Sequence, residues 1–374
     1  MKRSRIVVVA GLPDSLLNFR GDLLAAMVAA GHEVTAMAAP AAPAVISRLA
    51  DLRVAFRPFP LQRSGLNPFR DLQTYLALRR TLRELQPDVV LCYTIKPVIW
   101  GGLAVKGIPG ARFYALITGL GFAFQGSGLR RRLLMRLVAG LYRAAVATAS
   151  GVIFQNRNDR DVFVARGIAT APQCSVVNGS GVDLARFSVA PFPKTGAVFL
   201  TIGRLLGEKG FREYAEAARR VREVHPDAVF RLAGPVDPSP DGISMAEVSE
   251  WQDRGSIEYL GETNDVRAFL ADAHVFVLPS YHEGMPRTVL EALATGRPIL
   301  TTDVPGCRET VIPGENGALV PKGDAAALTD KILWFIEHRN EWPRMGARSR
   351  LLAEQRFDVR TVNSELMNIM RLAR

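Results

Sequence analysis

The sequence predicts an α/β protein of two domains, each built on a parallel sheet. The chain has 374 residues, and since a domain takes roughly 150 residues, this length suits two domains. Short apolar runs of strand length alternate with longer helix-like segments along the chain, which is typical of parallel sheets whose strands are connected by helices. Apolar residues make up 48% of the chain, enough to fill sizeable cores.

The predicted strands are short apolar runs bounded by turn residues, as expected of buried strands. In chain order they are Ile6–Ala10, Val34–Met37, Val89–Cys92, Arg112–Ile117, Val152–Gln155, Val198–Ile202, Val229–Ala233, Ile257–Leu260 and Val275–Leu278.

The predicted helices are longer segments, several of them ended by a glycine or proline. In chain order they are Leu16–Ala30, Phe69–Gln86, Leu129–Ala149, Asn158–Arg166, Phe211–Val224, a helix that begins at Pro286 and ends before Gly296, and Asp324–His338. The best linker is Ser188–Lys194, which holds two prolines. We therefore predict one domain at residues 1–190 and a second from residue 191.

Positive charge is concentrated in the first half of the chain. Residues 1–190 hold 24 Lys and Arg against 10 Asp and Glu, a net charge of +14, whereas the remainder holds 23 against 26, a net charge of −3. This asymmetry indicates an anionic surface or substrate for the first half. Nucleic acid is the rival interpretation, but the aromatic residues do not interleave with the charges as a stacking platform requires.

The cysteines and the hydropathy pattern indicate a cytoplasmic protein. Cys92, Cys174 and Cys307 are widely spaced and odd in number, which predicts no disulfide framework and a reducing compartment. The five histidines are scattered, so no metal site is predicted. The most apolar long window, Leu133–Phe154, is interrupted by Arg136 and falls short of the roughly 18–20 apolar residues of a membrane span.

The segment Tyr281–Arg297 combines the features of an anion site. A strand, a loop and a helix that begins at Pro286 direct backbone N–H groups and the positive end of a helix dipole to one point, which favours a phosphate. Glu283 and Glu291 lie on either side of that point, and carboxylates accept hydrogen bonds from the hydroxyls of a sugar or ribose. The alternative is an ordinary helix over a parallel sheet with glutamates on its surface.

Several residues of this segment together resemble the donor-sugar motif of the family 4 retaining glycosyltransferases. They are Glu283, Gly284, Pro286, Leu290, Glu291, Ala292 and Gly296, followed by Pro298 and Val304–Gly306. The resemblance implies the GT-B fold, in which two Rossmann-like domains with parallel sheets face each other across a cleft. It implies that the second domain, residues 191–357, binds the nucleotide-sugar and that the segment 358–374 crosses back to the first domain, residues 1–190, which binds the acceptor.

The loop Gly203–Gly210 resembles the family's GR…KG loop, with Arg204 and Lys209 in the charged positions. The resemblance implies catalytic roles for three residues: Arg204 and Lys209 hold the donor diphosphate, and Glu283 contacts the donor sugar and supports the oxocarbenium ion. It implies that Glu291 holds the ribose and that the backbone near Thr263 holds the base. The implied donor-binding residues are Gly203, Thr263, Gly284, Met285, Pro286, Thr288, Val289 and Glu291.

Two motifs of the first half, Thr94–Pro97 (TIKP) and Ile117–Gly121 (ITGLG), resemble the subgroup that glycosylates undecaprenyl-diphosphate-linked saccharides. The implied acceptor-binding residues are Arg20, Lys96, Thr118 and Gly119. Many family members carry a histidine after this strand, but Thr118 or Gly119 stands there instead, so no acceptor-side base is identified. The alternatives are a solvated arginine at Arg20 and a snorkelling surface lysine at Lys96.

The segment Leu129–Ala149 is predicted to lie in a membrane interface. Its apolar stripe and its five arginines suit an amphipathic helix on anionic headgroups. The stripe consists of Leu133, Leu134, Leu137, Val138 and Leu141. The alternative is a helix packed on the core with a solvated basic face.

Together these features predict a retaining glycosyltransferase that moves a sugar, an N-acetylhexosamine or a hexose, from a UDP-sugar to a polyprenyl-diphosphate-linked saccharide at the inner face of a bacterial cytoplasmic membrane. The expected partners are a nucleotide-sugar, the lipid-linked acceptor and an anionic membrane surface; no cofactor, metal or nucleic acid is expected. The preference for UDP over GDP rests on the resemblance alone. The rivals are a GT-B UDP-sugar epimerase, a glycosyltransferase with a soluble acceptor and a binding subunit without activity.

Overall fold

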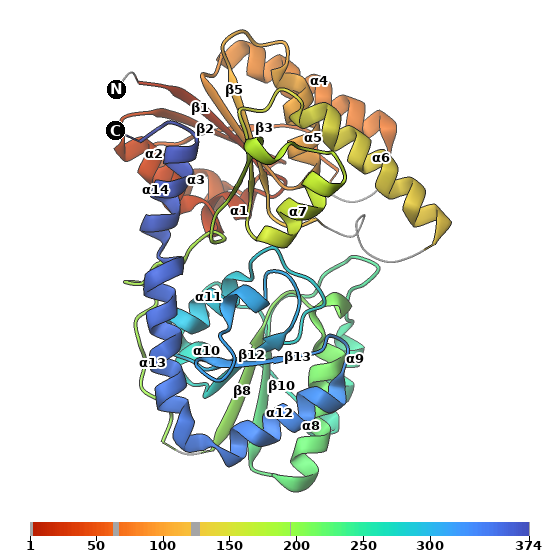
Figure 1. Ribbon diagram of the computed structural model, residues 1–374, viewed down its shortest axis with the longest axis vertical. Helices are drawn as coiled ribbons and strands as arrows, with labels where there is room; N and C mark the ends of the chain where they lie inside the picture. Colours follow the sequence, from red (N-terminus) through yellow and green to blue (C-terminus); the bar gives the residue numbers. More distant parts are fainter. Residues whose placement is uncertain (1–2, 63–66, 121–127, 195, 374) are drawn as a thin grey trace. The chain divides into compact units, whose positions relative to one another are not determined.

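The computed structural model describes residues 3–62, 67–120, 128–194 and 196–373, and it divides them into two compact units. The first unit comprises Met1–Ser180 together with Arg360–Arg374, and the second comprises Gly181–Val359. Within the described ranges, each unit holds one parallel sheet with helices on both faces, of seven strands in the first unit and six in the second (Figure 1). This confirms the predicted α/β class.

The first sheet has the strand order β3-β2-β1-β4-β5-β6-β7. Its strands are β1 (Arg5–Val9), β2 (Glu33–Ala38), β3 (Ala55–Pro58), β4 (Val89–Tyr93), β5 (Arg112–Ile117), β6 (Gly151–Phe154) and β7 (Cys174–Val176). The register pairs Val9 with Met37 on one side and with Cys92 on the other. The two outermost strands, β3 and β7, were not predicted, because most residues of β3 are exposed, those of β7 are only partly buried, and neither strand forms an apolar run.

The helices of the first unit are α1 (Pro13–Asn18), α2 (Gly21–Ala29), α3 (Pro43–Asp51), α4 (Pro68–Leu85), α5 (Ile95–Val105), α6 (Leu129–Val146), α7 (Arg157–Ala165) and α14 (Val359–Ile369). The predicted single helix Leu16–Ala30 is wrong, since α1 and α2 are separate. At Arg20 the backbone leaves the helical region, with φ −131° and ψ 1°, and the Arg20 side chain is buried.

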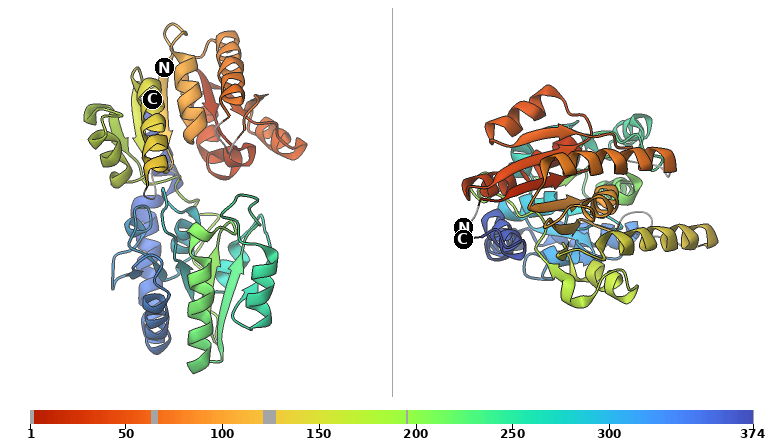
Figure 2. Two further views of the ribbon diagram at one scale, coloured as in Figure 1. Left: turned by 90° about the vertical axis from the view of Figure 1, so that its right-hand side faces the viewer. Right: turned by 90° about the horizontal axis from the view of Figure 1, so that it is seen from above.

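The second sheet has the strand order β10-β9-β8-β11-β12-β13. Its strands are β8 (Ala197–Ile202), β9 (Ala228–Ala233), β10 (Glu258–Tyr259), β11 (Val275–Leu278), β12 (Ile299–Thr302) and β13 (Gly317–Val320). Its helices are α8 (Phe211–Val224), α9 (Met245–Asp253), α10 (Arg267–Ala271), α11 (Arg287–Ala294), α12 (Ala325–Glu337) and α13 (Trp342–Leu352). Helix α8 lies beside α12, and α11 packs against α13 (Figures 1 and 2).

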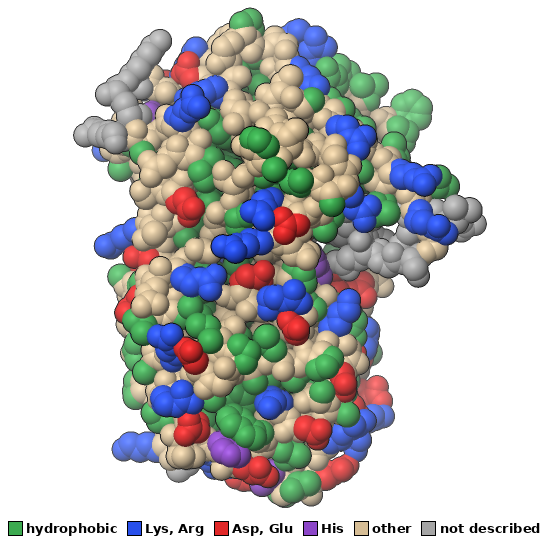
Figure 3. All heavy atoms as spheres, viewed as in Figure 1, with side chains coloured by type: hydrophobic (Ala, Val, Ile, Leu, Met, Phe, Trp, Pro, Cys, Tyr) green, Lys and Arg blue, Asp and Glu red, His purple; other side chains and the backbone are tan. Residues whose placement is uncertain are grey.

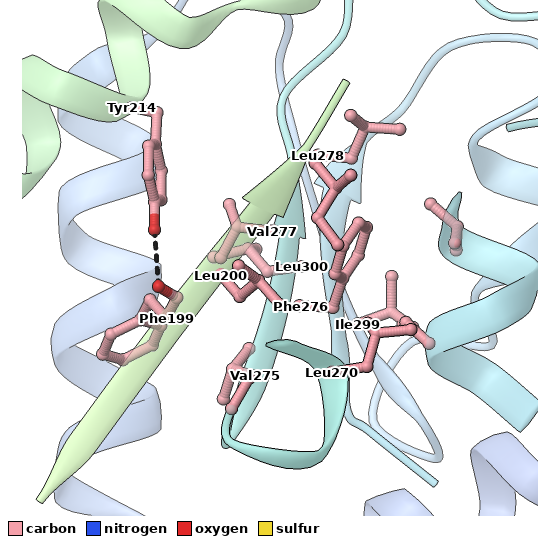
Figure 4. Close-up of a cluster of buried hydrophobic side chains, with 14 of the residues drawn as sticks. Phe199, Leu200, Tyr214, Leu270, Val275, Phe276, Val277, Leu278, Ile299 and Leu300 are labelled. Carbon is pink, nitrogen blue, oxygen red and sulfur yellow. Dashed lines mark hydrogen bonds between the residues drawn. The ribbon is translucent and has the colours of Figure 1, made fainter. Parts of the chain in front are cut away.

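Strand β11 lies in the middle of the second core. It pairs with β8 on one side and β12 on the other, and all four of its side chains are buried (Figure 4). Tyr214 of α8 reaches the sheet and donates a hydrogen bond of 2.8 Å to the carbonyl of Phe199 on β8. Each fully buried side chain of this size contributes about 1.5–3 kcal/mol to the stability of the fold. The core therefore holds the end of β11, and with it the start of the loop that follows, in one position.

The boundary between the units lies at Ser180–Gly181, before the predicted linker Ser188–Lys194. The N–H of Val182 donates to the carbonyl of Phe357, and the N–H of Val359 donates to the carbonyl of Val182. Phe187 is buried in the second core. These contacts hold the segment after Gly181 in the second unit, although a proline-based linker prediction places it in the first.

Both sheets reverse their strand order once, between β1 and β4 in the first and between β8 and β11 in the second. In open parallel sheets, ligands bind outside the carboxyl ends of the strands at such a switch point. The loops of interest are therefore those after β1 and β4 in the first unit and those after β8 and β11 in the second.

Candidate functional site

The loops after β8 and β11 meet at the switch point of the second sheet. Gly210, which ends the first loop, has φ 72°, and a Cβ there would lie 2.1 Å from the carbonyl oxygen of Pro279 in the second loop. The contact leaves room for glycine alone. This close approach brings the charged residues of the Gly203–Gly210 loop beside those that follow Pro279.

Lys209 and Glu283 form an ion pair at this junction. Nζ of Lys209 lies 2.5 Å from Oε1 of Glu283, and the hydroxyl of Ser280 donates to the same oxygen at 2.8 Å. The two side chains are only 17% and 12% exposed, so the alternative of a surface glutamate at position 283 is wrong. The structure brings together the two residues that the sequence assigned to the donor diphosphate and the donor sugar.

A third loop, the turn at Val304–Gly306, holds the backbone of Glu283. The N–H of Glu283 donates to the carbonyl of Pro305 at 3.3 Å. Gly306 has φ 84°, and a Cβ there would lie 2.5 Å from the carbonyl oxygen of Glu283. The turn at Val304–Gly306 therefore packs directly on the Glu283 backbone and restricts its movement.

Arg204 lies in the same loop as Lys209 but is paired differently. Its side chain is 46% exposed, and its guanidinium forms an ion pair with Asp237. Burial works to raise the pKa of the Asp237 carboxyl, but hydrogen bonds from Ser239 and the contact with Arg204 lower this pKa below its usual value. Arg204 and Lys209 both lie near Glu208, where burial raises the pKa of the carboxyl and these two cations oppose the shift.

Helix α11 begins one residue later than predicted, because Pro286 is its N-cap, with φ −75° and ψ 108°. Within the described part of the chain, no side chain caps this helix. The first N–H groups of a helix have no partner inside it, so this end of α11 can accept an anion.

The predicted donor-binding residues at this helix end differ in how deeply they are buried. Gly284 and Pro286 are buried, Thr288 is half-buried, and Met285 and Val289 are part of the second core. The Val289 side chain is fully buried, so a contact from Val289 to a donor would come from its backbone atoms. The N–H of Val289 already donates to the carbonyl of Pro286.

Glu291 is nearly buried and paired within its own helix. Nε of Arg287 donates to Oε1 of Glu291 at 2.9 Å. Burial raises the pKa of the Glu291 carboxyl, and Arg287 opposes the shift without cancelling it. Sequence reasoning missed the role of Arg287, although its position four residues before Glu291 is the signal for such a pair.

Thr263 lies in the exposed loop after β10, where its hydroxyl accepts a hydrogen bond of 3.1 Å from the N–H of Asp265. Asp265 is close enough to Glu291 to raise the pKa of that carboxyl, and Arg186 is close enough to lower it. The loop that the sequence assigned to the base therefore borders the residue assigned to the ribose.

Two neighbours of Glu283, Tyr281 and His282, were not among the predicted site residues. The hydroxyl of Tyr281 donates to Glu213 of α8 at 2.5 Å, and burial raises the pKa of Tyr281 to about 12. Burial also lowers the pKa of His282, and its buried Nε2 has no hydrogen-bond partner among the described residues. No sequence pattern signals the contact with Glu213, because it joins residues far apart in the chain.

In the first unit, Arg20 and Lys96 are both largely buried. Arg20 is 2% exposed, and its guanidinium lies over the ring of Tyr93 with 5.6 Å to the ring centroid. Nζ of Lys96 lies 2.7 Å from Oδ1 of Asp71, at the start of α4. The alternatives of a solvated arginine and a snorkelling lysine are wrong, and the charge of Lys96 is paired within the fold.

Thr118 and Gly119 follow β5, and Gly119 has φ 139°. The motif Ile117–Gly121 is described only as far as Leu120, and its last residue lies outside the described residues.

Helix α6 exposes part of its apolar stripe. Leu133 and Leu137 are 56% and 57% exposed, whereas Val138 is buried. The arginine nearest its end, Arg143, donates to the backbone carbonyl of Gly167. Figures 1 and 2 show α6 extending beyond its sheet, with its first turns outermost. Among the described residues, no helix combines the length and the apolar content needed to cross a bilayer.

Two family models match the two halves of the chain. The model described as glycosyl transferase 4-like domain matches residues 19–179, and the model described as glycosyl transferases group 1 matches residues 196–338. The matched regions include every residue assigned above to the donor and the acceptor.

Curated relatives match over most of their length. An N,N'-diacetylbacillosaminyl-diphospho-undecaprenol alpha-1,3-N-acetylgalactosaminyltransferase from Campylobacter jejuni is 29% identical over 307 residues, which cover 78% of each chain. A UDP-Gal:alpha-D-GlcNAc-diphosphoundecaprenol alpha-1,3-galactosyltransferase from Escherichia coli is 27% identical over 72% of this chain and 71% of its own.

Solved structures share the fold. HepE from Anabaena, in complex with UDP and glucose, matches with a TM-score of 0.79 at 18% identity, over 99% of this chain and 100% of its own. Sucrose-phosphate synthase from Thermosynechococcus elongatus matches with a TM-score of 0.81 at 18% identity, over 99% of this chain and 98% of its own.

Proposed function

The chain belongs to glycosyltransferase family 4 with the GT-B fold, and we propose that it transfers a sugar from a UDP-sugar to a polyprenyl-diphosphate-linked saccharide with retention of anomeric configuration. The proposed setting is the assembly of a bacterial surface glycan at the inner face of the cytoplasmic membrane. The observation that carries the proposal is the Lys209–Glu283 contact at the switch point of the second sheet, beside the N-terminal end of α11.

The second unit supports a nucleotide diphosphate as the leaving group. Lys209 and Arg204 supply two cations from one loop, and the start of α11 supplies backbone N–H groups. These groups neutralise charge as it develops on the departing diphosphate, which is the largest contribution that such a site makes to rate. We propose that transfer proceeds in this way without a metal ion.

The proposed chemistry uses the leaving group as the base. The bond between the anomeric carbon and the UDP oxygen breaks, and the acceptor hydroxyl oxygen bonds to the same face of that carbon. The acceptor proton passes to the departing phosphate oxygen, so no protein base is required. Glu283 accepts hydrogen bonds from donor-sugar hydroxyls and stabilises the oxocarbenium ion, and Glu291 accepts them from the ribose.

The choice of a UDP-sugar and a lipid acceptor follows the chain's relatives. The names of the two curated relatives specify undecaprenol-diphosphate acceptors, and one name specifies UDP-Gal. HepE was solved with UDP bound. The acceptor class also agrees with the net charge of +14 in residues 1–190, because both the diphosphate and the lipid surface are anionic.

Two helices of the first unit support a membrane location. Besides Leu133 and Leu137 of α6, helix α4 exposes Phe69, Leu72 and Leu76, and both helices contact α5. Arginines accompany these apolar side chains, and Figure 3 shows basic and apolar side chains close together on the part of the first unit where α4 and α6 lie. Apolar side chains flanked by arginines suit the interface of an anionic membrane.

The proposal is tested with a panel of UDP- and GDP-sugars and an undecaprenyl-diphosphate-monosaccharide acceptor, in detergent with EDTA. We expect one UDP-sugar to give a lipid-linked disaccharide whose new linkage has the anomeric configuration of the donor, measured by proton NMR. An inverted linkage would contradict retention. Transfer to a soluble glycan alone, or epimerisation of the UDP-sugar without transfer, would establish one of the rival functions instead.

A further inference from the structure

One residue at the switch point of the first sheet has a backbone conformation that its type rarely adopts. Thr94, directly after β4, has φ 68° and ψ 160°. This region is essentially restricted to glycine, and a β-branched residue there is strained. Such strain is concentrated at ligand-binding positions, where the surrounding structure holds it.

The loop after β1 leaves room for the Thr94 side chain. A Cβ on Gly11 would lie 2.8 Å from Oγ1 of Thr94. Gly11 does not have a positive φ, so its backbone conformation does not itself require glycine. Glycine at position 11 therefore makes space for the hydroxyl of Thr94 at the carboxyl ends of β1 and β4, where open parallel sheets bind ligands.

The Thr94 hydroxyl is not used by the fold. Within the described part of the chain it makes no hydrogen bond and does not cap α5, although Thr94 immediately precedes that helix. The backbone carbonyl of Thr94, in contrast, accepts from the N–H of Val98 at 3.0 Å. The hydroxyl is thus available to a ligand, while the backbone of the residue is held.

The surroundings of Thr94 favour an anionic ligand. The preceding residue, Tyr93, lies beside the guanidinium of Arg20, and its hydroxyl is 2.8 Å from that of Ser15. The start of α5, which no side chain of the described residues caps, adds the positive end of a helix dipole. Asp71, the nearby carboxylate on α4, is paired with Lys96.

We propose that Thr94 is an acceptor-binding residue whose hydroxyl donates a hydrogen bond to a phosphate oxygen of the lipid-linked acceptor. This inference rests on the proposed function, because it takes the acceptor to be a diphosphate. The backbone at Thr94 fixes the direction of the hydroxyl, and Gly11 keeps the space for it.

The test compares Thr94→Val, Thr94→Ser and Thr94→Gly in steady-state transfer to the undecaprenyl-diphosphate-linked monosaccharide. Loss of a hydrogen bond to a charged group corresponds to roughly a 10- to 100-fold change. We expect the valine and glycine variants to raise the acceptor KM by that factor, with the UDP-sugar KM unchanged, and the serine variant to restore the wild-type value. The Tm of the glycine variant should not fall, because glycine relieves the strain.

A further variant, Gly11→Ala, distinguishes loss of the Thr94 hydroxyl contact from general damage to the fold. Gly11→Ala should raise the acceptor KM in the wild-type protein, because its methyl group displaces the hydroxyl, and should have no further effect in Thr94→Gly. If wild type transfers to the lipid acceptor and Thr94→Val has an unchanged acceptor KM, this inference alone is wrong. If wild type makes no lipid-linked product, the proposed function fails and the inference fails with it.

Discussion

At the residue scale, the Lys209–Glu283 pair shows how two distant parts of the chain form one site. The residues follow different strands, and their contact is fixed by Ser280 and by the close approach of Gly210 to Pro279. Burying two charges costs free energy, which their mutual attraction and added hydrogen bonds offset. The pair holds Lys209 in one position, as electrostatic preorganisation requires for its proposed contact with the donor diphosphate.

Glu291 gives a prediction for the pH dependence of stability. Burial raises the pKa of this carboxyl in the folded state. As pH rises from the usual pKa to the raised one, the unfolded state loses the proton first, so the contribution of Glu291 to stability becomes less favourable. We expect the Tm of Glu291→Gln, relative to wild type, to increase as pH is raised from about 4 to 7. A difference in Tm that is independent of pH would contradict the raised pKa.

Gly210 gives a prediction for the junction of the two loops. Gly210→Ala combines a positive φ with a Cβ 2.1 Å from the carbonyl oxygen of Pro279. Gly255 is the matched control, because it has φ 66° but no heavy atom within 4 Å of the point where a Cβ would lie. We expect Gly210→Ala to lower the free energy of unfolding by at least about 2 kcal/mol more than Gly255→Ala, measured by urea unfolding. Equal losses would show that the close approach is absent.

At the element scale, the sequence predicted most of the buried strands because each is a run of apolar residues, but it missed the buried strand β12, half of which is Thr301–Thr302. The predicted bounds of Val275–Leu278 equal those of β11, and the predicted Val198–Ile202 differs by one residue from β8. The outermost strands β3 and β7 lack such runs. Helix α5 was missed because Thr94–Pro97 was interpreted as a loop at a strand end, although proline is tolerated in the first turn of a helix.

The exposed stripe of α6 gives a prediction for membrane binding. Leu133→Gln together with Leu137→Gln should weaken binding to vesicles that contain anionic lipid by roughly 10-fold or more, since each leucine contributes about 1.5 kcal/mol or more on burial. Leu351→Gln is the control, because Leu351 is an exposed leucine of the second unit. The measurement is vesicle co-sedimentation of wild type, the double variant and Leu351→Gln. Equal binding by these three proteins would exclude α6 from the membrane contact.

At the scale of the whole molecule, the sequence indicated the candidate site residues but not the residues with which the fold pairs them. Short motifs, each local in the chain, select Arg204, Lys209, Glu283 and Glu291 as candidates, and their roles stay predictions. The contacts of Arg204 with Asp237 and of Lys96 with Asp71 join loops and helices far apart in sequence. Such contacts depend on the packed fold, so no local pattern predicts them.

Transfer of label from the UDP-sugar to lipid tests the central claim most directly. The measurement is the rate at which radiolabel from a UDP-sugar enters undecaprenyl-diphosphate-monosaccharide with wild type, Lys209→Ala and Lys194→Ala, the last removing an exposed lysine outside the site. Loss of one oriented charged contact to the leaving group costs about 100-fold or more in turnover. We expect labelled lipid product from wild type and Lys194→Ala, and at least about 100-fold less from Lys209→Ala. No lipid product from wild type, or equal rates for the two lysine variants, would contradict the account.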